Sequence, residues 1–118
     1  MQFIVLAAIV PDAQEENVMK IAKEAGAGSA TILHGKTIGL KEKKVFFGLT
    51  LEENVSILLF ILPKRISVIT FKRLKEELKP GEEEDAQNGM VFTFPLTHLS
   101  GLNIDEIDFF EEEIKNEL

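Results

Sequence analysis

Two long apolar runs, each ended by a proline, constrain the fold of this chain more than any other feature. Residues 2–10 and 54–62 are rich in Ile, Val, Leu and Phe, and they stop at Pro11 and Pro63. Apolar runs of this length are typical of strands that are buried on both faces. The sequence therefore predicts two central strands in a sheet whose two faces both need cover.

Each central strand is followed by a helical pattern. Asp12 and Glu15 have the spacing of a capping box, and apolar residues then recur at helical spacing until Gly26 ends the pattern. Pro63 fits the first turn of a second helix, where its missing N–H has no cost. The predicted apolar stripe of this second helix consists of Ile66, Ile69, Phe71, Leu74 and Leu78.

Two further segments alternate as strands do. Residues 29–34 place Thr31 and His34 on opposite faces, and residues 90–96 contain Pro95, which must lie near a strand end or on an edge. Both segments are therefore predicted to be strands of the same sheet.

The remaining segments are shorter or more polar. Residues 45–47 are predicted to be a hairpin tip or a separate edge strand, and residues 97–102 a connection or a strand fragment. The acidic run 82–85 is predicted to be a solvated loop that could also repel a triphosphate or recruit a divalent cation. A capping-box pattern opens a last helix over residues 103–118.

The order of these elements predicts an α+β fold, ferredoxin-like βαββαβ, with an antiparallel sheet, both helices on one face and an added C-terminal helix. We expect one domain over residues 1–118, divided into a ferredoxin-like core (1–102) and the C-terminal helix (103–118). The other face of the sheet is expected to pack on a partner subunit, with the C-terminal helix as the competing cover.

Composition and missing motifs exclude several classes of function. The chain has no cysteine, which rules out thiolate metal sites and thiol nucleophiles, and its net charge of −7 opposes nucleic-acid binding. It contains no Gly-x-Ser-x-Gly or P-loop pattern, so no enzymatic activity is expected. The apolar start lacks the basic region of a signal peptide, and no apolar run has membrane-spanning length, so a cytoplasmic location is expected.

Some residues are candidates for anion or metal binding. Glycine turns can hold phosphate oxygens through backbone N–H groups, with lysines adding charge, although the same residues also suit plain turns and a solvated loop. The two histidines, His34 and His98, could hold a metal or act as acid and base. Because the sequence places no further ligands beside them, structural or surface roles are favoured. The glycines and lysines concerned are Gly35, Gly39, Gly89, Lys36, Lys41, Lys43 and Lys44.

Residues 25–39, Ala-Gly-Ala-Gly-Ser-Ala-Thr-Ile-Leu-His-Gly-Lys-Thr-Ile-Gly, and residues 88–96, Asn-Gly-Met-Val-Phe-Thr-Phe-Pro-Leu, carry a family resemblance. Together they resemble the PII nitrogen-regulatory superfamily, and more closely its divergent PII-like members. The likeness extends over residues 2–102 in the order of elements.

The resemblance implies a homotrimer that binds a small-molecule adenine nucleotide, ATP, ADP or AMP, or a similar small anion, in clefts between subunits. The loop over residues 36–53 would signal to a regulated protein target, and peripheral contact with a membrane transporter is one form this could take. Thr31 would lie at the adenine edge, and Asn88 with Gly89 would end the phosphate loop. The base of the signalling loop would consist of Lys36, Thr37, Gly39 and Lys41.

Departures from the family pattern limit what is expected. The chain has no tyrosine, which excludes tyrosine uridylylation. Lys41 stands where the family has the glutamine that helps to hold magnesium and 2-oxoglutarate, so 2-oxoglutarate sensing is not expected and a role for magnesium stays open.

Two alternatives also stay open. A ligand-independent trimeric structural or interaction module is favoured by the absence of a lysine from residues 87–90 and by the acidic run. A metal-handling trimer resembling the CutA family would share the architecture, but the lack of cysteine and the two separated histidines oppose it.

Overall fold

A computed structural model describes residues 2–39, 45–46, 49–50, 53–78 and 89–101 of the chain. In chain order the elements are β1 (Phe3–Pro11), the 3-10 helix η1 (Asp12–Gln14), α1 (Glu15–Ala25), β2 (Thr31–Thr37), β3 (Val45–Phe46), β4 (Leu49–Thr50), β5 (Glu53–Pro63), α2 (Lys64–Glu77) and β6 (Met90–Pro95).

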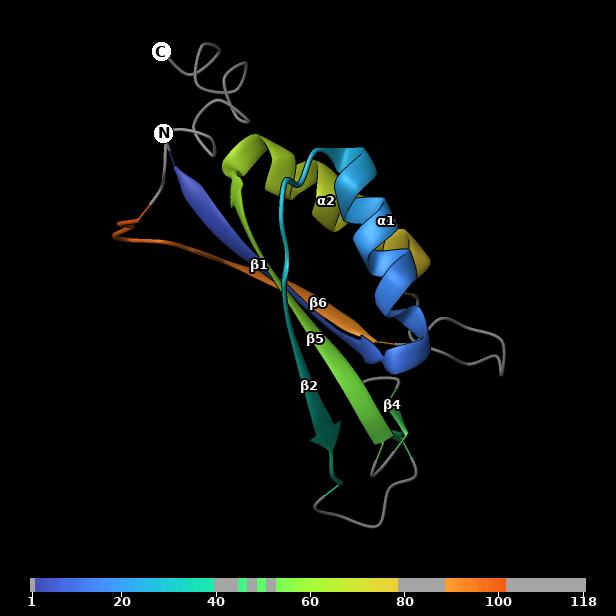
Figure 1. Cartoon of the computed structure of the whole chain (residues 1–118). Helices are drawn as coiled ribbons and strands as arrows, with labels where there is room; N and C mark the ends of the chain where they lie inside the picture. The colour runs from blue at the N-terminus through green and yellow to red at the C-terminus, as the bar shows by residue number, and fades with distance from the viewer. Residues whose placement is uncertain (1, 40–44, 47–48, 51–52, 79–88, 102–118) are drawn as a thin grey trace.

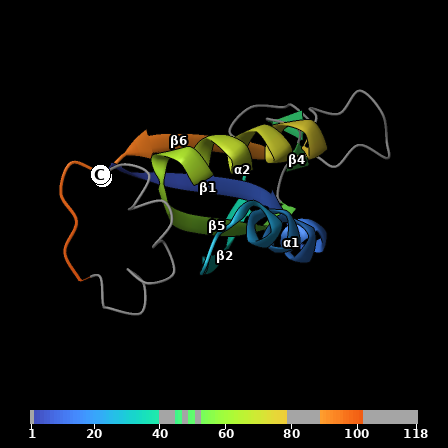
Figure 2. The same cartoon turned by 90° about the horizontal axis from the view of Figure 1, so that it is seen from above.

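Four strands form one antiparallel sheet in the order β2-β5-β1-β6, and both α-helices lie on one of its faces (Figure 1). β1 pairs with β5 along its whole length, from Phe3↔Pro63 to Pro11↔Val55. α2 packs over β1, β5 and β6, whereas α1 lies toward the β2 side (Figure 2). The structure therefore confirms the ferredoxin-like α+β fold that the element order predicts.

The core lies between the sheet and the two helices. It is built from alternate residues of the central strands and from one face of each helix, as the period of two in strands and the helical stripe require. Its buried members are Leu6, Ala8, Val10, Val18, Ala22, Ala27, Leu58, Phe60, Leu62, Ile66, Leu74 and Leu78. No helix within the described ranges is both long and apolar enough to cross a membrane.

The ends of α1 agree only in part with the prediction. Gly26 ends the helix in a left-handed conformation, with φ of 117°, and its N–H donates to the Ala22 and Lys23 carbonyls. The predicted capping box is wrong, because neither η1 nor α1 has a side-chain cap hydrogen bond. The Asp12 and Glu15 carboxylates lie instead against the sheet.

α2 begins one residue later than predicted, and it packs the predicted stripe against the core except at Ile69. Pro63 has the extended ψ of 146° of a residue that precedes the helix. Ile69 of the predicted stripe is 41% exposed, and Thr70 beside it is fully buried. The Thr70 hydroxyl donates to the Ile66 carbonyl at 2.8 Å, so its burial leaves no donor unsatisfied.

The other predicted segments have mixed outcomes. β3 and β4 pair as a two-stranded antiparallel ladder, which favours the hairpin over the separate edge strand. Residues 97–101 form no strand. Of the two predicted alternatives for this segment, the structure therefore supports the connection and not the strand fragment. The acidic run 82–85 and the predicted helix 103–118 lie outside the described residues.

Candidate functional site

β2 carries four of the residues predicted to bind a ligand, namely Thr31, Gly35, Lys36 and Thr37. Thr31 begins the strand opposite Leu59 of β5, and Thr37 ends it opposite Glu53. Because side chains alternate along a strand, Thr31 and Thr37 lie on the sheet face away from the helices, whereas Lys36 lies on the helix face. Thr31 and Lys36 are exposed, and Thr37 is half-buried.

Gly35 does not form the turn that the sequence suggested, whereas ligand binding at Gly35 and Gly39 stays a prediction. Gly35 lies inside β2, paired with Val55, and positive φ values among the described glycines occur only at Gly26, Gly89 and Gly101. β2 therefore continues to Thr37 instead of ending at His34, and Gly35 lies within the strand. The prediction failed because strand pairing with β5 overrides the turn preference of an isolated glycine.

Gly89 does have the geometry that requires glycine. Its φ is 154°, and a Cβ atom at this position would lie 2.8 Å from the Ile9 carbonyl oxygen and 2.8 Å from Val10 Cγ1. The chain thus enters β6 through a close approach to β1 that no other residue could make without displacement. Asn88 and Lys41, the two other predicted contacts, lie outside the described residues.

The predicted ligand residues fall on opposite edges of the sheet. β2 and β6 are the two outer strands of the order β2-β5-β1-β6, with both central strands between them. Three strand spacings separate them by about 14 Å. One chain therefore does not bring Thr31 and Lys36 together with Gly89.

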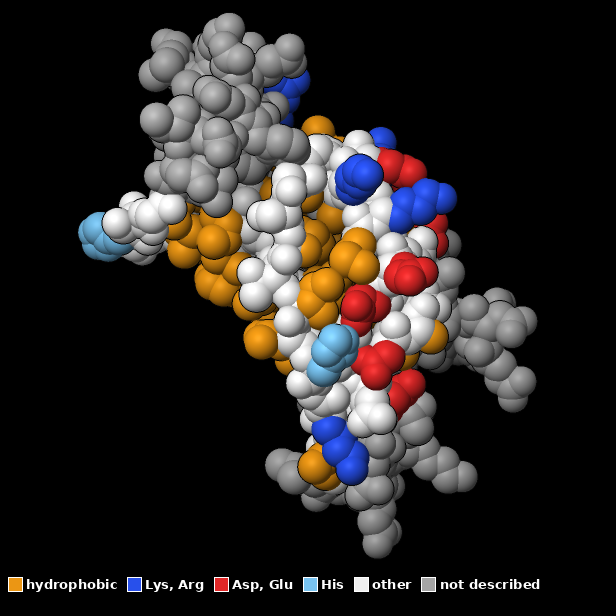
Figure 3. All heavy atoms as spheres, viewed as in Figure 1, with side chains coloured by type: hydrophobic (Ala, Val, Ile, Leu, Met, Phe, Trp, Pro, Cys, Tyr) orange, Lys and Arg blue, Asp and Glu red, His pale blue; other side chains and the backbone are white. Residues whose placement is uncertain are grey.

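The sheet face away from the helices is apolar and exposed. Register places Leu33, Ile61, Phe92 and Phe94 on this face, and they are 50%, 47%, 39% and 45% exposed respectively. The Phe92 and Phe94 rings stack with centroids 6.4 Å apart. Hydrophobic side chains gather along this side of the sheet in Figure 3. We call these four residues the open sheet face.

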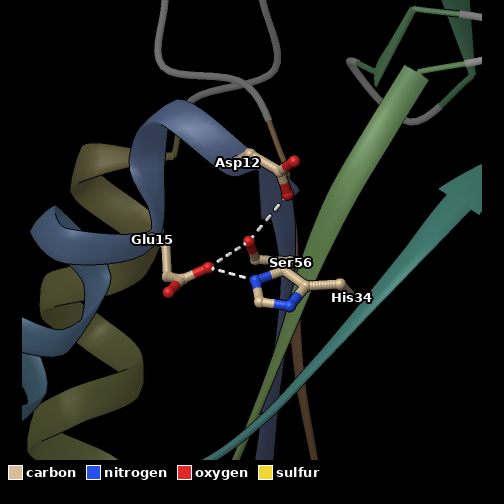
Figure 4. Close-up of polar contacts among 4 residues, drawn as sticks. All are labelled: Asp12, Glu15, His34 and Ser56. Atoms are coloured by element: carbon tan, nitrogen blue, oxygen red, sulfur yellow. Dashed lines mark hydrogen bonds and ion pairs between the residues drawn. The ribbon is translucent and has the colours of Figure 1, made fainter.

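A polar cluster that the sequence analysis missed lies at the start of α1. Ser56 of β5 is fully buried, and its Oγ is 2.9 Å from Asp12 Oδ1 and 2.6 Å from Glu15 Oε2. His34 of β2 reaches the same Glu15 oxygen through Nε2 at 2.8 Å (Figure 4). Three elements and η1 thus contribute to the cluster Asp12, Glu15, His34 and Ser56.

The cluster perturbs one of its carboxyl groups. The hydrogen bond from Ser56, followed by the contact with His34, lowers the pKa of Glu15 below its ordinary value of 4.5. A signal for the cluster did exist in the sequence. Ser56 is the one polar residue between Val55 and Pro63 of β5, and it falls on the face that turns toward the helix.

Comparison with known proteins gives results at the level of the fold. No family model matches the chain, and no curated protein matches it in sequence. Among solved structures, the chain is similar to a PII-like signalling protein of Thermus thermophilus, with 14% identity, TM-score 0.58, and coverage of 81% of this chain and 88% of the other.

Two further solved structures of this kind carry ligands. CPII of Thiomonas intermedia K12, a nitrogen regulatory PII-like protein bound to ADP, AMP and bicarbonate, gives 17% identity and TM-score 0.60 over 81% of this chain and 93% of CPII. B. subtilis GlnK in complex with ATP gives 17% identity and TM-score 0.58 over 81% of this chain and 83% of GlnK. The fold is that of PII-like proteins. The expected likeness to PII-like proteins is thereby confirmed at the level of the fold.

Proposed function

We propose that this protein is a PII-like regulator that binds an adenine nucleotide, or a similar small anion, in clefts between the subunits of a homotrimer. It acts in the cytoplasm as a signalling protein rather than an enzyme, and the whole of residues 1–118 forms one PII-like domain. The segment over residues 36–53, which begins within β2 and ends at the first residue of β5, transmits ligand occupancy to a protein target, and a membrane transporter is one option.

The observation that carries this proposal is that the predicted ligand residues lie on opposite edges of the four-stranded sheet. Thr31 and Lys36 lie on the β2 edge, and Gly89 lies on the β6 edge. A ligand that contacts both sets must lie where the β2 edge of one subunit meets the β6 edge of its neighbour. Proteins of the same fold with bound ADP, AMP and ATP support the choice of ligand class.

The open sheet face supports the assembly. Exposed apolar patches of this kind on a soluble chain mark surfaces that a partner covers. Leu33 lies on the β2 side of this face and Phe92 and Phe94 on the β6 side, so the apolar surface extends across the whole sheet. A symmetric trimer would cover it and bring unlike edges together.

Nucleotide binding is tested by calorimetry on the full chain with ATP, ADP, AMP and cyclic AMP, each with and without magnesium. We expect heat from at least one nucleotide, and weaker binding in Lys36→Gln because a charge-assisted contact is lost. Lys72→Gln, which removes an exposed lysine from α2, is the matched control and should bind normally. Absence of heat with every nucleotide would overturn the proposal.

One alternative is supported by the same open sheet face. A trimer that makes contacts through its sheet and loop without any ligand would also cover Leu33, Ile61, Phe92 and Phe94. A solution mass of three times the 13.2 kDa chain together with no nucleotide heat would select this interaction module. A monomeric mass would remove both proposals.

A further inference from the structure

The polar cluster at the start of α1 brings together metal-ligating atoms from three parts of the chain. One ligand atom each from Asp12, Glu15 and His34 lies within 4.8 Å of the other two. His34 lies on the helix face of β2, and the acids belong to η1 and the first turn of α1, so the ligands approach from different sides (Figure 4). The His34 side chain is 65% exposed and that of Glu15 is 23% exposed, which leaves the cluster open to solvent ions.

The second observation is that Ser56 has fewer hydrogen atoms to donate than it has carboxylate neighbours. Its hydroxyl carries one hydrogen, yet its Oγ lies within hydrogen-bond distance of both Asp12 and Glu15. Because the Ser56 side chain is fully buried, it holds two carboxylates close together while satisfying only one of them at a time. A cation placed between the carboxylates would satisfy both charges and relieve their repulsion.

We propose that Asp12, Glu15 and His34 bind a divalent transition-metal cation of the Zn²⁺ class, with water as the fourth ligand. Imidazole nitrogen together with carboxylate oxygens is a donor set that Zn²⁺ accepts, whereas Ca²⁺ and Mg²⁺ require more oxygen ligands. Tetrahedral bonds of about 2.0–2.2 Å place ligand atoms about 3.3–3.6 Å apart. The ligand atoms of Asp12, Glu15 and His34, all within 4.8 Å of one another, are close to this spacing. Ser56 positions the carboxylates and does not bind the metal.

Because the site lies near the end of the β2–β5 ladder, a bound metal would connect separate elements of the fold. His34 and Ser56 face each other in the β2–β5 register, three pairs inward from Thr37↔Glu53, where the ladder ends. A bound cation therefore ties the start of α1 to β2, one of the two strands that lead into and out of residues 38–52. The three proposed ligands are different residues from the proposed nucleotide contacts Thr31, Lys36 and Gly89.

The site is tested on the metal-free full chain by competition for Zn²⁺ against a chromogenic chelator, with no nucleotide present. We expect one Zn²⁺ per chain, and affinity at least about tenfold weaker in Asp12→Asn, Glu15→Gln and His34→Gln. His98→Gln removes the other histidine, which lies beyond β6, and is expected to leave the affinity unchanged. Circular dichroism shows whether each variant keeps the fold.

A measurement on the unsubstituted protein guards against variants that fail to fold. Zn²⁺ should shift the ¹⁵N resonance of His34 Nε2 and leave the His98 ring unchanged. The proposal is overturned if Zn²⁺ shifts only the His98 ring, if His34→Gln binds Zn²⁺ as tightly as the parent chain, or if the chain binds no Zn²⁺. Since nucleotide is absent, none of these results bears on the nucleotide proposal.

Discussion

Ser56 and Gly89 show how single residues shape this protein. Ser56 is a buried hydroxyl within the apolar run from Val55 to Pro63 of β5, and it connects this strand to Asp12 and Glu15. Gly89 allows β6 to begin in close contact with the β1 backbone. In both cases a neighbour that is distant in sequence requires this residue type. Each substitution therefore has a specific expected effect.

Replacing Ser56 with Ala should raise the pKa of Glu15 in the metal-free protein. The Ser56 hydrogen bond is the main cause of the lowered value, so its loss returns the carboxyl toward 4.5. A carbon-detected NMR titration of the Glu15 carboxyl measures the change. Ser67→Ala removes a buried hydroxyl that donates to the Lys64 carbonyl on α2, and it should leave Glu15 unaffected.

The same shift determines the sign of a pH effect on stability. A carboxyl whose pKa is lower when folded stabilises the protein above its ordinary pKa and loses this contribution as pH falls through the folded pKa. Ser56→Ala should therefore show a weaker loss of stability below pH 4.5 than the parent chain. An equal acid dependence in both proteins would contradict the assigned cause.

Replacing Gly89 with Ala should lower the free energy of unfolding by about 1–3 kcal/mol, because a strained φ is added to two contacts at 2.8 Å. Urea unfolding followed by circular dichroism gives the change. Gly35→Ala is the matched control, since Gly35 has no positive φ and its nearest neighbour would be 3.7 Å away. A similar loss at both glycines would show that strand composition, and not the close approach to β1, is responsible.

At the scale of elements, α2 shows how packing chooses the buried face of a helix. Its buried residues include Ser67 and Thr70, whose hydroxyls donate to carbonyls of the preceding turn, while the apolar Val68 and Ile69 are exposed. Hydrophobicity alone predicted Ile69 on the core side. The position of α2 over β1, β5 and β6 decided otherwise, because burial of Ile66 and Leu74 sets the rotation of the helix.

This rotation predicts unequal costs for two apolar substitutions on α2. Leu74→Ala should destabilise the protein by about 2–5 kcal/mol, since the fully buried side chain leaves a cavity. Ile69→Ala, at a side chain that is 41% exposed, should change stability by no more than about 0.5 kcal/mol. Denaturant midpoints with unchanged slopes would measure both, and equal losses would contradict the register of α2.

At the scale of the whole molecule, the sheet is covered on one face only within the described residues. α1 and α2 close one side, and the open sheet face leaves Leu33, Ile61, Phe92 and Phe94 exposed on the other. Central strands that are apolar on both faces are stable in water when a second layer covers them. The proposed trimer supplies this layer and also joins the β2 and β6 edges.

A charge placed on the open sheet face should break the assembly. Phe94→Glu should reduce the mass measured by light scattering from three chains to one, because an unpaired carboxylate cannot be buried cheaply between apolar sheets. Val68→Glu on α2 replaces a side chain of nearly equal exposure, 46% against 45%, on the helix side, and should keep the parent mass. Dissociation by both variants, or by neither, would contradict this interface.

Local signals in the sequence were sufficient for the four strands of the main sheet, the two α-helices and their order. Pro11 and Pro63 end the central strands because proline cannot continue the ladder, and Gly26 ends α1 because it accepts a left-handed conformation. These effects depend on neighbouring residues alone. The ferredoxin-like arrangement then followed from the order of strands and helices.

Only the tertiary structure decided which residues meet. Ser56 contacts Asp12, which is 44 residues away, and His34 contacts Glu15, which is 19 residues away. The same sheet order that creates this cluster separates Thr31 from Gly89 on opposite edges. Periodicity and turn chemistry act over a few residues, whereas strand register and helix rotation are set by packing of the whole core, so the sequence by itself determined the elements and the folded chain determined the sites.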